Sequence, residues 1–207
     1  METERQKLLD LYHQALDARR AGNLPAAVTH LRGCLALAKQ LGDGLSRGRL
    51  CALLGDIQLE AGAPAEALTC FELAAQVLTG TELRRERLMM LFRLGQAARD
   101  ARNETRAIEA YDEIIRLAQG SADIRAEGLA RALRGELVCE RGSYREGLEQ
   151  MLLGMQRLRT AKAPELDAVI SRAAHYGSHL PRKEYERMIK DLAVGRDIRH
   201  RLLGDTV

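Results

Sequence analysis

Four cysteines are the residues of this sequence best suited to bind a metal or to form disulfides. They stand at positions 34, 51, 70 and 139. No two of them form a C-x-x-C pair and their spacing shows no regular pairing, so neither a zinc site nor a disulfide framework is indicated. Cys34 and Cys51 fall at positions that pack helices together, which predicts ordinary reduced thiols in a core. Reduced thiols in turn predict a cytoplasmic location.

A histidine pair and a carboxylate pair each have a spacing of four residues, which places both side chains of a pair on the same face of a helix. His175 and His179 are four residues apart and could bind a metal, but no third ligand lies in an obvious frame. Glu136 and Glu140 have the same spacing, which is common on solvated helices. The glycine-rich stretch at 42–48 lacks the preceding strand and the lysine–hydroxyl pair of a phosphate loop. Without an H-E-x-x-H motif or a nucleophile elbow, the sequence predicts no catalysis, no metal site and no cofactor.

Charge and aromatic content argue against nucleic acid as a partner. The formal net charge is only +3, and aromatic residues make up 3% of the chain. The densest basic run, RRER at 84–87, is interrupted by a glutamate. Binding through counterion release needs a continuous basic stripe with stacking aromatic side chains. A membrane span is not expected either, because no apolar segment approaches the ~18 residues that crossing requires.

The sequence repeats itself with a period of 40 residues. The stretches at 14–31, 54–71, 94–111 and 134–151 align without gaps. Two columns of this alignment hold small residues and a third holds large apolar residues. The small columns are Ala15, Gly55, Gly95 and Gly135, and Ala27, Ala67, Ala107 and Gly147; the large column is Leu31, Phe71, Tyr111 and Met151. Such a period indicates stacked repeats, because one unit cannot bury its apolar face alone, and the small residues predict a close approach of two helices.

Each repeat has the pattern of two amphipathic helices joined by a short turn. Apolar residues recur at spacings of three and four on both sides of the turn. Gly22, Gly62 and Gly142 mark the turn, and Arg102 interrupts this glycine column. No long run alternates with period two, so a sheet is not expected.

On these residues the chain resembles the tetratricopeptide repeat (TPR) family. The family's unit has a small residue in its first helix, a glycine-like turn, an alanine in its second helix and an aromatic residue four places later. Gly55, Gly62, Ala67 and Phe71 match these features, and the resemblance covers roughly residues 8–160. The usual unit has about 34 residues, so about six extra residues must lengthen the helices or their connection. Units of 40 residues are similar to those of the scaffolds Pins and rapsyn and of helical sensor domains in bacterial regulators.

The resemblance implies an all-α fold, a right-handed α-α superhelical solenoid. We expect four TPR hairpins over residues 1–163 and a degenerate C-terminal capping pair of helices over 164–207, within one continuous domain. Pro164 and Pro181 each open a further helical pattern, at roughly 165–179 and 182–203. We interpret this pair as a cap, because a solenoid needs a polar end to its stack.

The resemblance also implies a concave groove, lined by the first helix of each unit, in which a peptide or a partner helix lies. The lysine and asparagine pair with which chaperone-binding members hold a peptide carboxylate is missing. We therefore predict a non-enzymatic adaptor or scaffold that binds a protein segment of mixed charge. The expected contact residues are Tyr12, Arg19, Arg49, Asp56, Met89, Phe92, Arg93, Gln96, Arg99 and Glu136.

Two other functions remain open. The chain could assemble with copies of itself, since the ends of solenoids readily stack. It could also be a sensor in which a peptide or small ligand changes the superhelix. A chain that stays monomeric without its partner favours the adaptor. Assemblies whose size increases with protein concentration favour self-assembly.

Overall fold

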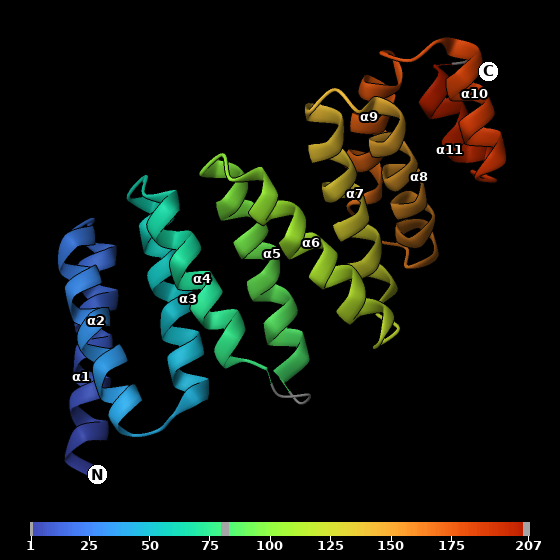
Figure 1. Ribbon diagram of the computed structural model, residues 1–207. Helices are drawn as coiled ribbons and strands as arrows, with labels where there is room; N and C mark the ends of the chain where they lie inside the picture. The colour runs from blue at the N-terminus through green and yellow to red at the C-terminus, as the bar shows by residue number, and fades with distance from the viewer. Residues whose placement is uncertain (1, 80–82, 205–207) are drawn as a thin grey trace. The chain divides into compact units, whose positions relative to one another are not determined.

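The structure is a computed structural model that describes residues 2–79 and 83–204; within these residues it contains eleven helices and no strand. This confirms the predicted all-α fold class. The chain divides into two compact units, Met1–Ala107 and Ile108–Val207. The helices are α1 (Glu2–Arg20), α2 (Leu24–Gln40), α3 (Gly44–Glu60), α4 (Pro64–Val77), α5 (Arg84–Asp100), α6 (Glu104–Gln119), α7 (Ile124–Glu140), α8 (Tyr144–Thr160), α9 (Leu166–Gly177), α10 (Arg182–Asp191) and α11 (Arg196–Leu203) (Figure 1).

Most turns between helices share one backbone pattern, which recurs every 20 residues. The N–H of the last turn residue donates back across the turn, as from Asn23 to the carbonyl of Ala18 at 2.8 Å, which is the Schellman arrangement. The residue before it has a left-handed backbone, at Gly22, Gly42, Gly62, Arg102, Ala122, Gly142 and Lys162. Helices α2, α3, α5, α7 and α8 each have 17 residues. Because most connections are this short, the residues beyond the usual TPR length lie in the helices.

Short polar side chains begin four of the helices. Asn23, Asp43, Asn103 and Asp123 each accept a hydrogen bond from the N–H three residues later, at 2.9 to 3.2 Å. An N-cap of this kind stabilises a helix by about 1 kcal/mol. The hydroxyl of Ser46 also donates to Asp43 at 2.6 Å, and this hydrogen bond lowers the pKa of Asp43.

Arg102 occupies the glycine position of its turn without changing the backbone. Its φ is 56°, close to the 73° of Gly22 and the 71° of Gly62. A non-glycine residue pays about 1 kcal/mol or more in this conformation. We therefore expect Arg102→Gly to raise the free energy of unfolding by about 0.5–1 kcal/mol, measured by urea denaturation. Arg102→Ala retains the Cβ and should give no gain; an equal gain from both variants would contradict this explanation.

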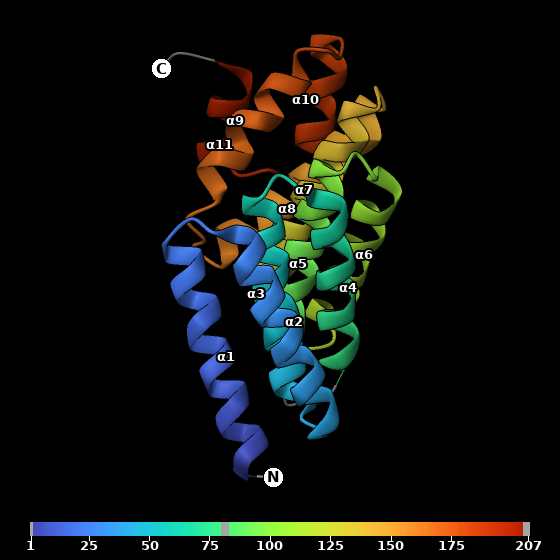
Figure 2. The same ribbon diagram turned by 90° about the vertical axis from the view of Figure 1, so that its left-hand side faces the viewer.

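In residues 1–107 the first helices of the hairpins, α1, α3 and α5, form one layer, and the second helices form another (Figures 1 and 2). Within this second layer, Arg106 at the start of α6 forms an ion pair with Glu72 of α4 at 2.5 Å. Within the second hairpin, a Cβ on Gly55 would lie 2.8 Å from ring atoms of Phe71. The predicted close approach of two helices at the small column is thus confirmed at Gly55.

In residues 108–207, α7 and α8 pack backbone against backbone. A Cβ on Gly135 would collide with the carbonyl oxygen of Gly147 and lie 2.9 Å from the Cγ of Met151. Two turns away, a Cβ on Gly128 would lie 2.9 Å from the carbonyl oxygen of Gly154. Glycines on both helices are therefore what allow this pair to approach.

The C-terminal residues described by the structure form three helices where the sequence predicted two. Helix α9 agrees with the first prediction, but the helix predicted over 182–203 is wrong, because it is divided into α10 and α11. The break comes at Ala193, which has a left-handed φ of 50°. The N–H of Val194 there donates to the carbonyl of Ile189 at 3.1 Å, so the Schellman turn of the earlier repeats is used again.

Helix α10 is anchored on α9 by Tyr185. Its ring lies against Gly177, at which a Cβ would collide with it. Its hydroxyl donates to the carbonyl of Ala173 at 3.2 Å, and burial raises the pKa of Tyr185. One apolar core contains Met151 and Leu152 of α8 together with residues of α9, α10 and α11.

A buried carboxylate connects three helices of residues 108–207. Glu127 of α7 is 5% exposed. It accepts hydrogen bonds from Gln119 at 3.1 Å and Arg131 at 3.0 Å, and Arg157 of α8 lies 3.4 Å away. Burial alone would raise the pKa of Glu127, but these hydrogen bonds and the two arginine charges hold it below its ordinary value.

This network predicts a pH dependence of stability. Because the pKa of Glu127 is lower in the folded than in the unfolded chain, its contribution is present above the unfolded pKa and is lost as the pH falls through the folded pKa. We expect Glu127→Gln to reduce the free energy of unfolding by about 2 kcal/mol at neutral pH. The difference from wild type should shrink below about pH 4. A difference that stays constant in urea titrations down to about pH 3 would show that the charge is not responsible.

Candidate functional site

Nine of the ten predicted contact residues lie on α1, α3 and α5, in residues 1–107, and the tenth, Glu136, lies on α7. Helices α1, α3 and α5 are the first helices of their hairpins, so the structure places the nine on the layer that the sequence analysis expected to face a partner. Their surroundings divide this layer into two halves of different chemistry.

Towards the C-terminal ends of these helices, three of the predicted contact residues form ion pairs between neighbouring helices. Arg19 of α1 forms an ion pair with Glu60 of α3, and Asp56 of α3 forms one with Arg93 of α5. The hydrogen bond from Arg19 lowers the pKa of Glu60 and raises that of Arg19. All four side chains remain partly exposed, so each pair adds at most about 1 kcal/mol. Their charges are largely neutralised within the layer.

The same half holds Gln96 and Arg99. The amide of Gln96 donates to Asp100, one turn later on α5, at 2.9 Å. Arg99 is half-buried near the end of α5. This half is therefore polar, and much of its hydrogen-bonding capacity is used internally.

Towards the N-terminal ends, the layer exposes large apolar side chains. Leu9 of α1 is 48% exposed and Met89 of α5 is 50% exposed. They occupy equivalent positions two repeats apart, and Arg49 is the exposed equivalent on α3 between them. Tyr12 and Phe92, one turn further along α1 and α5, are half-buried. Exposed leucine or methionine side chains of this kind mark interaction surfaces when they gather on one face.

Three exposed arginines accompany these apolar side chains. They are Arg5, Arg49 and Arg85. Arg5 and Arg85 lie one helical turn before Leu9 and Met89, and therefore on the same face of their helices. None of the three forms a hydrogen bond or ion pair with any residue of 2–79 or 83–204, although the charge of Arg5 contributes to lowering the pKa of Asp43. We call Arg5, Leu9, Tyr12, Arg49, Arg85, Met89 and Phe92 together the cationic-apolar patch.

Sequence reasoning missed Arg5 and Arg85. The sequence does contain a pattern that indicates them: an arginine stands four residues before an apolar residue of the predicted contact column, at Arg5 and Leu9 and again at Arg85 and Met89.

Glu136 has a different environment in residues 108–207. It is 8% exposed, and one of its oxygens lies 3.5 Å from the guanidinium of Arg172 on α9. Arg125 of α7 and Glu165 also pair, as successive first helices do in residues 1–107. Glu136 is thus a residue of the α7–α9 contact, buried rather than displayed to a partner.

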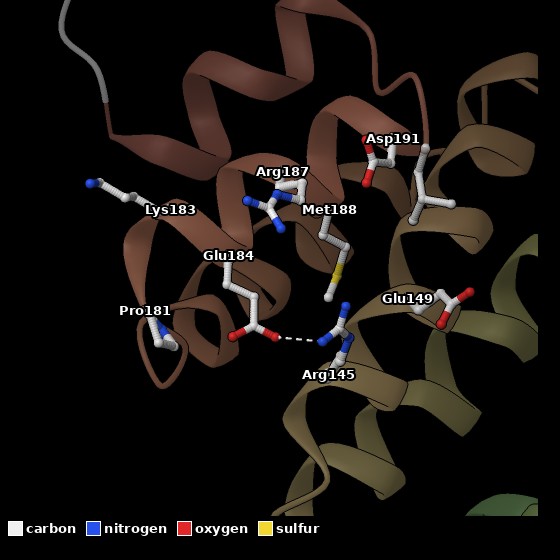
Figure 3. A pocket seen from close by; sticks show the side chains of 9 residues that line it. Arg145, Glu149, Pro181, Lys183, Glu184, Arg187, Met188 and Asp191 are labelled. Atoms are coloured by element: carbon white, nitrogen blue, oxygen red, sulfur yellow. Dashed lines mark ion pairs between the residues drawn. The ribbon is translucent and has the colours of Figure 1, made fainter.

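The same unit contains a hollow that the sequence did not predict. It has a volume of about 500 Å³ and lies between α8 and α10 (Figure 3). Its lining is Arg145, Glu149, Pro181, Lys183, Glu184, Arg187, Met188, Asp191 and Leu192. We call it the α8–α10 furrow. The furrow lies beside α10, which is only 10 residues long. Neither the furrow nor this short helix could be predicted from the 40-residue repeat.

The cysteines and histidines form no chemical site in the part of the chain that is described. Cys34, Cys51 and Cys139 are buried, as the sequence analysis expected of the first two, and all four thiols are free. Burial raises the pKa of Cys51 to about 11, which leaves it protonated and unreactive near neutral pH. The rings of His175 and His179 lie 5.5 Å apart, but the described residues contain no group of three or more metal-ligating side chains.

Comparisons with known proteins identify the fold. No protein-family model matches the sequence, and no curated protein matches it either. Among solved structures, the apo form of RapI is similar, with a TM-score of 0.73, 12% identity and coverage of 92% of this chain and 69% of that one. TPR-like repeats of a putative kinesin light chain from Podosopora anserina give a TM-score of 0.67, 16% identity and coverage of 99% and 100%. BtubC (BKLC) from P. vanneervenii gives a TM-score of 0.60 and 12% identity, with coverage of 99% of this chain and 94% of that one.

These similarities show that the chain has a TPR-type solenoid fold, as its 40-residue columns predicted. Identities this low concern the fold alone. Within the described residues, no helix has both the length and the apolar character needed to cross a membrane.

Proposed function

We propose that this protein with a TPR-type fold is a non-enzymatic, cytoplasmic adaptor that binds a segment of another protein on its cationic-apolar patch. The observation that carries the proposal is the exposure of Leu9 and Met89 at equivalent positions of α1 and α5, with the exposed Arg49 between them. Burying such side chains against a partner stabilises a complex by about 25 cal/mol per Å² of apolar surface.

The side chains of the patch support a segment of particular chemistry. Arg5, Arg49 and Arg85 form no hydrogen bond or ion pair with a described residue, so carboxylates of the segment can pair with them in a bidentate fashion. Leu9 and Met89, with Tyr12 and Phe92 beside them, offer contacts for large apolar side chains. Aromatic and arginine side chains are also the types that contribute most at protein interfaces. The proposed segment is therefore acidic and amphipathic.

The spacing of the helices sets the length of the segment. Directly packed helices have axes about 8–10 Å apart. Helices α1 and α3, and α3 and α5, are bridged by ion pairs of long side chains rather than by close backbone packing, so two steps from α1 to α5 cover at least about 20 Å. An extended segment needs at least about six residues to cover that distance and a helix at least about thirteen. Either fits the recognition modes in which an amphipathic element lies across a groove.

A matched pair of substitutions tests the proposal. Leu73 on α4 is also exposed, at 38%, but lies in the second layer. We expect Met89→Asp to lose a partner that wild-type protein captures from a lysate, while Leu73→Asp retains it, with the partner quantified by mass spectrometry. Thermal unfolding should be the same for both variants. Equal capture by both would refute the placement of the site, and capture of nothing but the protein itself would favour self-assembly.

A further inference from the structure

We propose that the α8–α10 furrow is a separate binding site for a short peptide of two or three residues with free termini, held as a zwitterion. The furrow lies between α8 and α10, within residues 108–207, so this inference does not depend on the cationic-apolar patch. Its volume of about 500 Å³ falls in the range of small-molecule sites.

Contacts between α8 and α10 favour a ligand that ends inside the furrow. Near the start of both helices, Arg145 forms an ion pair with Glu184 at 3.0 Å, drawn as a dashed line in Figure 3. Near their ends, the amide of Gln156 donates to the carbonyl oxygen of Leu192. A partner helix or a long extended segment running along the furrow would have to break one of these contacts. A short ligand fits between them.

The unpaired charges of the furrow are separated by sign. Lys183 and Arg187 lie on one side of Met188, and Asp191 and Glu149 lie on the other (Figure 3). All four charged side chains are exposed, and none forms a hydrogen bond or ion pair with a residue that the structure describes. A ligand with a carboxylate at one end and an ammonium group at the other would complement both sides.

The distances agree with a peptide of two or three residues. Along α10, Arg187 and Asp191 are four residues apart and Lys183 and Asp191 are eight apart, which corresponds to about 6 and 12 Å. An extended peptide covers about 3.3 Å per residue, so two or three residues cover about 7–10 Å. Met188 and Leu192 are half-buried and offer apolar contact to the side chains between the termini.

The test uses the tripeptide Leu-Ala-Leu and two blocked forms of it. We expect the free tripeptide to bind in calorimetric titrations, and the N-acetylated and the C-amidated forms each to bind at least tenfold more weakly, about 1.4 kcal/mol. In spectra of protein labelled at the methionine methyl groups, the signal of Met188, assigned with Met188→Leu, should shift. The signal of Met89 should not.

Substitutions on α10 localise the effect. Arg187→Gln and Asp191→Asn should each weaken the free tripeptide about tenfold. Lys190→Gln, on the same helix but outside the furrow lining, should leave binding unchanged. Equal binding of the blocked and free peptides, or absence of binding, would overturn the inference. A shift at Met89 in place of Met188 would overturn it too, while supporting a peptide site on α1, α3 and α5.

Discussion

Gly135→Ala is expected to reduce the free energy of unfolding by about 3 kcal/mol, which makes it among the most damaging single-methyl additions in the chain. The added Cβ would meet the carbonyl oxygen of Gly147 and would lie 3.0 Å from the backbone N of Met151. Backbone atoms of a packed helix cannot move aside independently, so α7 and α8 would have to separate along their whole contact. At about 2–4 °C per kcal/mol, the melting temperature should fall by roughly 6–12 °C.

Two other glycines serve as controls for this prediction. At Gly55 the atoms met by a Cβ belong to the ring of Phe71, a side chain that can shift, so Gly55→Ala should cost less than Gly135→Ala. At Gly120 the nearest atoms are 3.7 Å away, an ordinary contact, and Gly120→Ala should change the melting temperature by less than about 2 °C. A melting temperature for Gly135→Ala equal to that of Gly120→Ala would mean that α7 and α8 do not pack through these glycines.

Reversal of the three arginines of the cationic-apolar patch is the second large effect that we expect. The triple variant Arg5→Glu, Arg49→Glu, Arg85→Glu should bind the captured partner about 100-fold more weakly than wild type, about 2.7 kcal/mol. Each substitution removes a pairing arginine and adds a repulsion against an acidic segment. Wild-type binding should also weaken with added salt, because these side chains are exposed.

A control for this reversal changes the net charge by the same amount at exposed positions outside the patch. Arg32 and Lys39 on α2 and Arg102 in a turn are suitable. Their triple replacement by glutamate should leave affinity within about threefold of wild type at physiological salt. Equal losses in both triple variants would show that only the overall charge of the protein matters, and that the patch does not recognise the partner.

Repeating features of the fold could be predicted from the sequence because they depend on local rules. A glycine inside a helix, such as Gly55, indicates that another helix packs closely against it, because a side chain would not fit there. Glycines at the turns, such as Gly22 and Gly62, indicate a left-handed backbone, which glycine adopts readily. Arg102 shows the limit of this reasoning, since the turn's hydrogen bonds hold a non-glycine residue in the same backbone conformation. The division of α10 from α11 was missed for a similar reason, because Ala193 is not a residue type that signals a left-handed turn.

The candidate site was predictable only in outline. The column spacing placed Arg49 and Met89 on the correct layer, but it could not show that Asp56 and Arg93 pair with each other. That pairing joins residues 37 positions apart, which is not a multiple of the repeat, and depends on how long side chains reach across neighbouring helices. Asp56 and Glu136 also occupy equivalent positions of the repeat, so the sequence predicts the same environment for both. In the structure, however, Glu136 is buried in the contact between α7 and α9.

Photo-crosslinking from single positions shows whether the cationic-apolar patch binds a protein segment. A photoreactive amino acid at Met89 lies within the patch, and the same amino acid at Leu73 is exposed on α4 outside it. We expect position 89 to crosslink in cells to one predominant protein, through a segment rich in aspartate or glutamate and in large apolar residues, and position 73 not to crosslink to it. Crosslinking of the same proteins from both positions, or of a predominantly basic segment from position 89, would contradict the proposal.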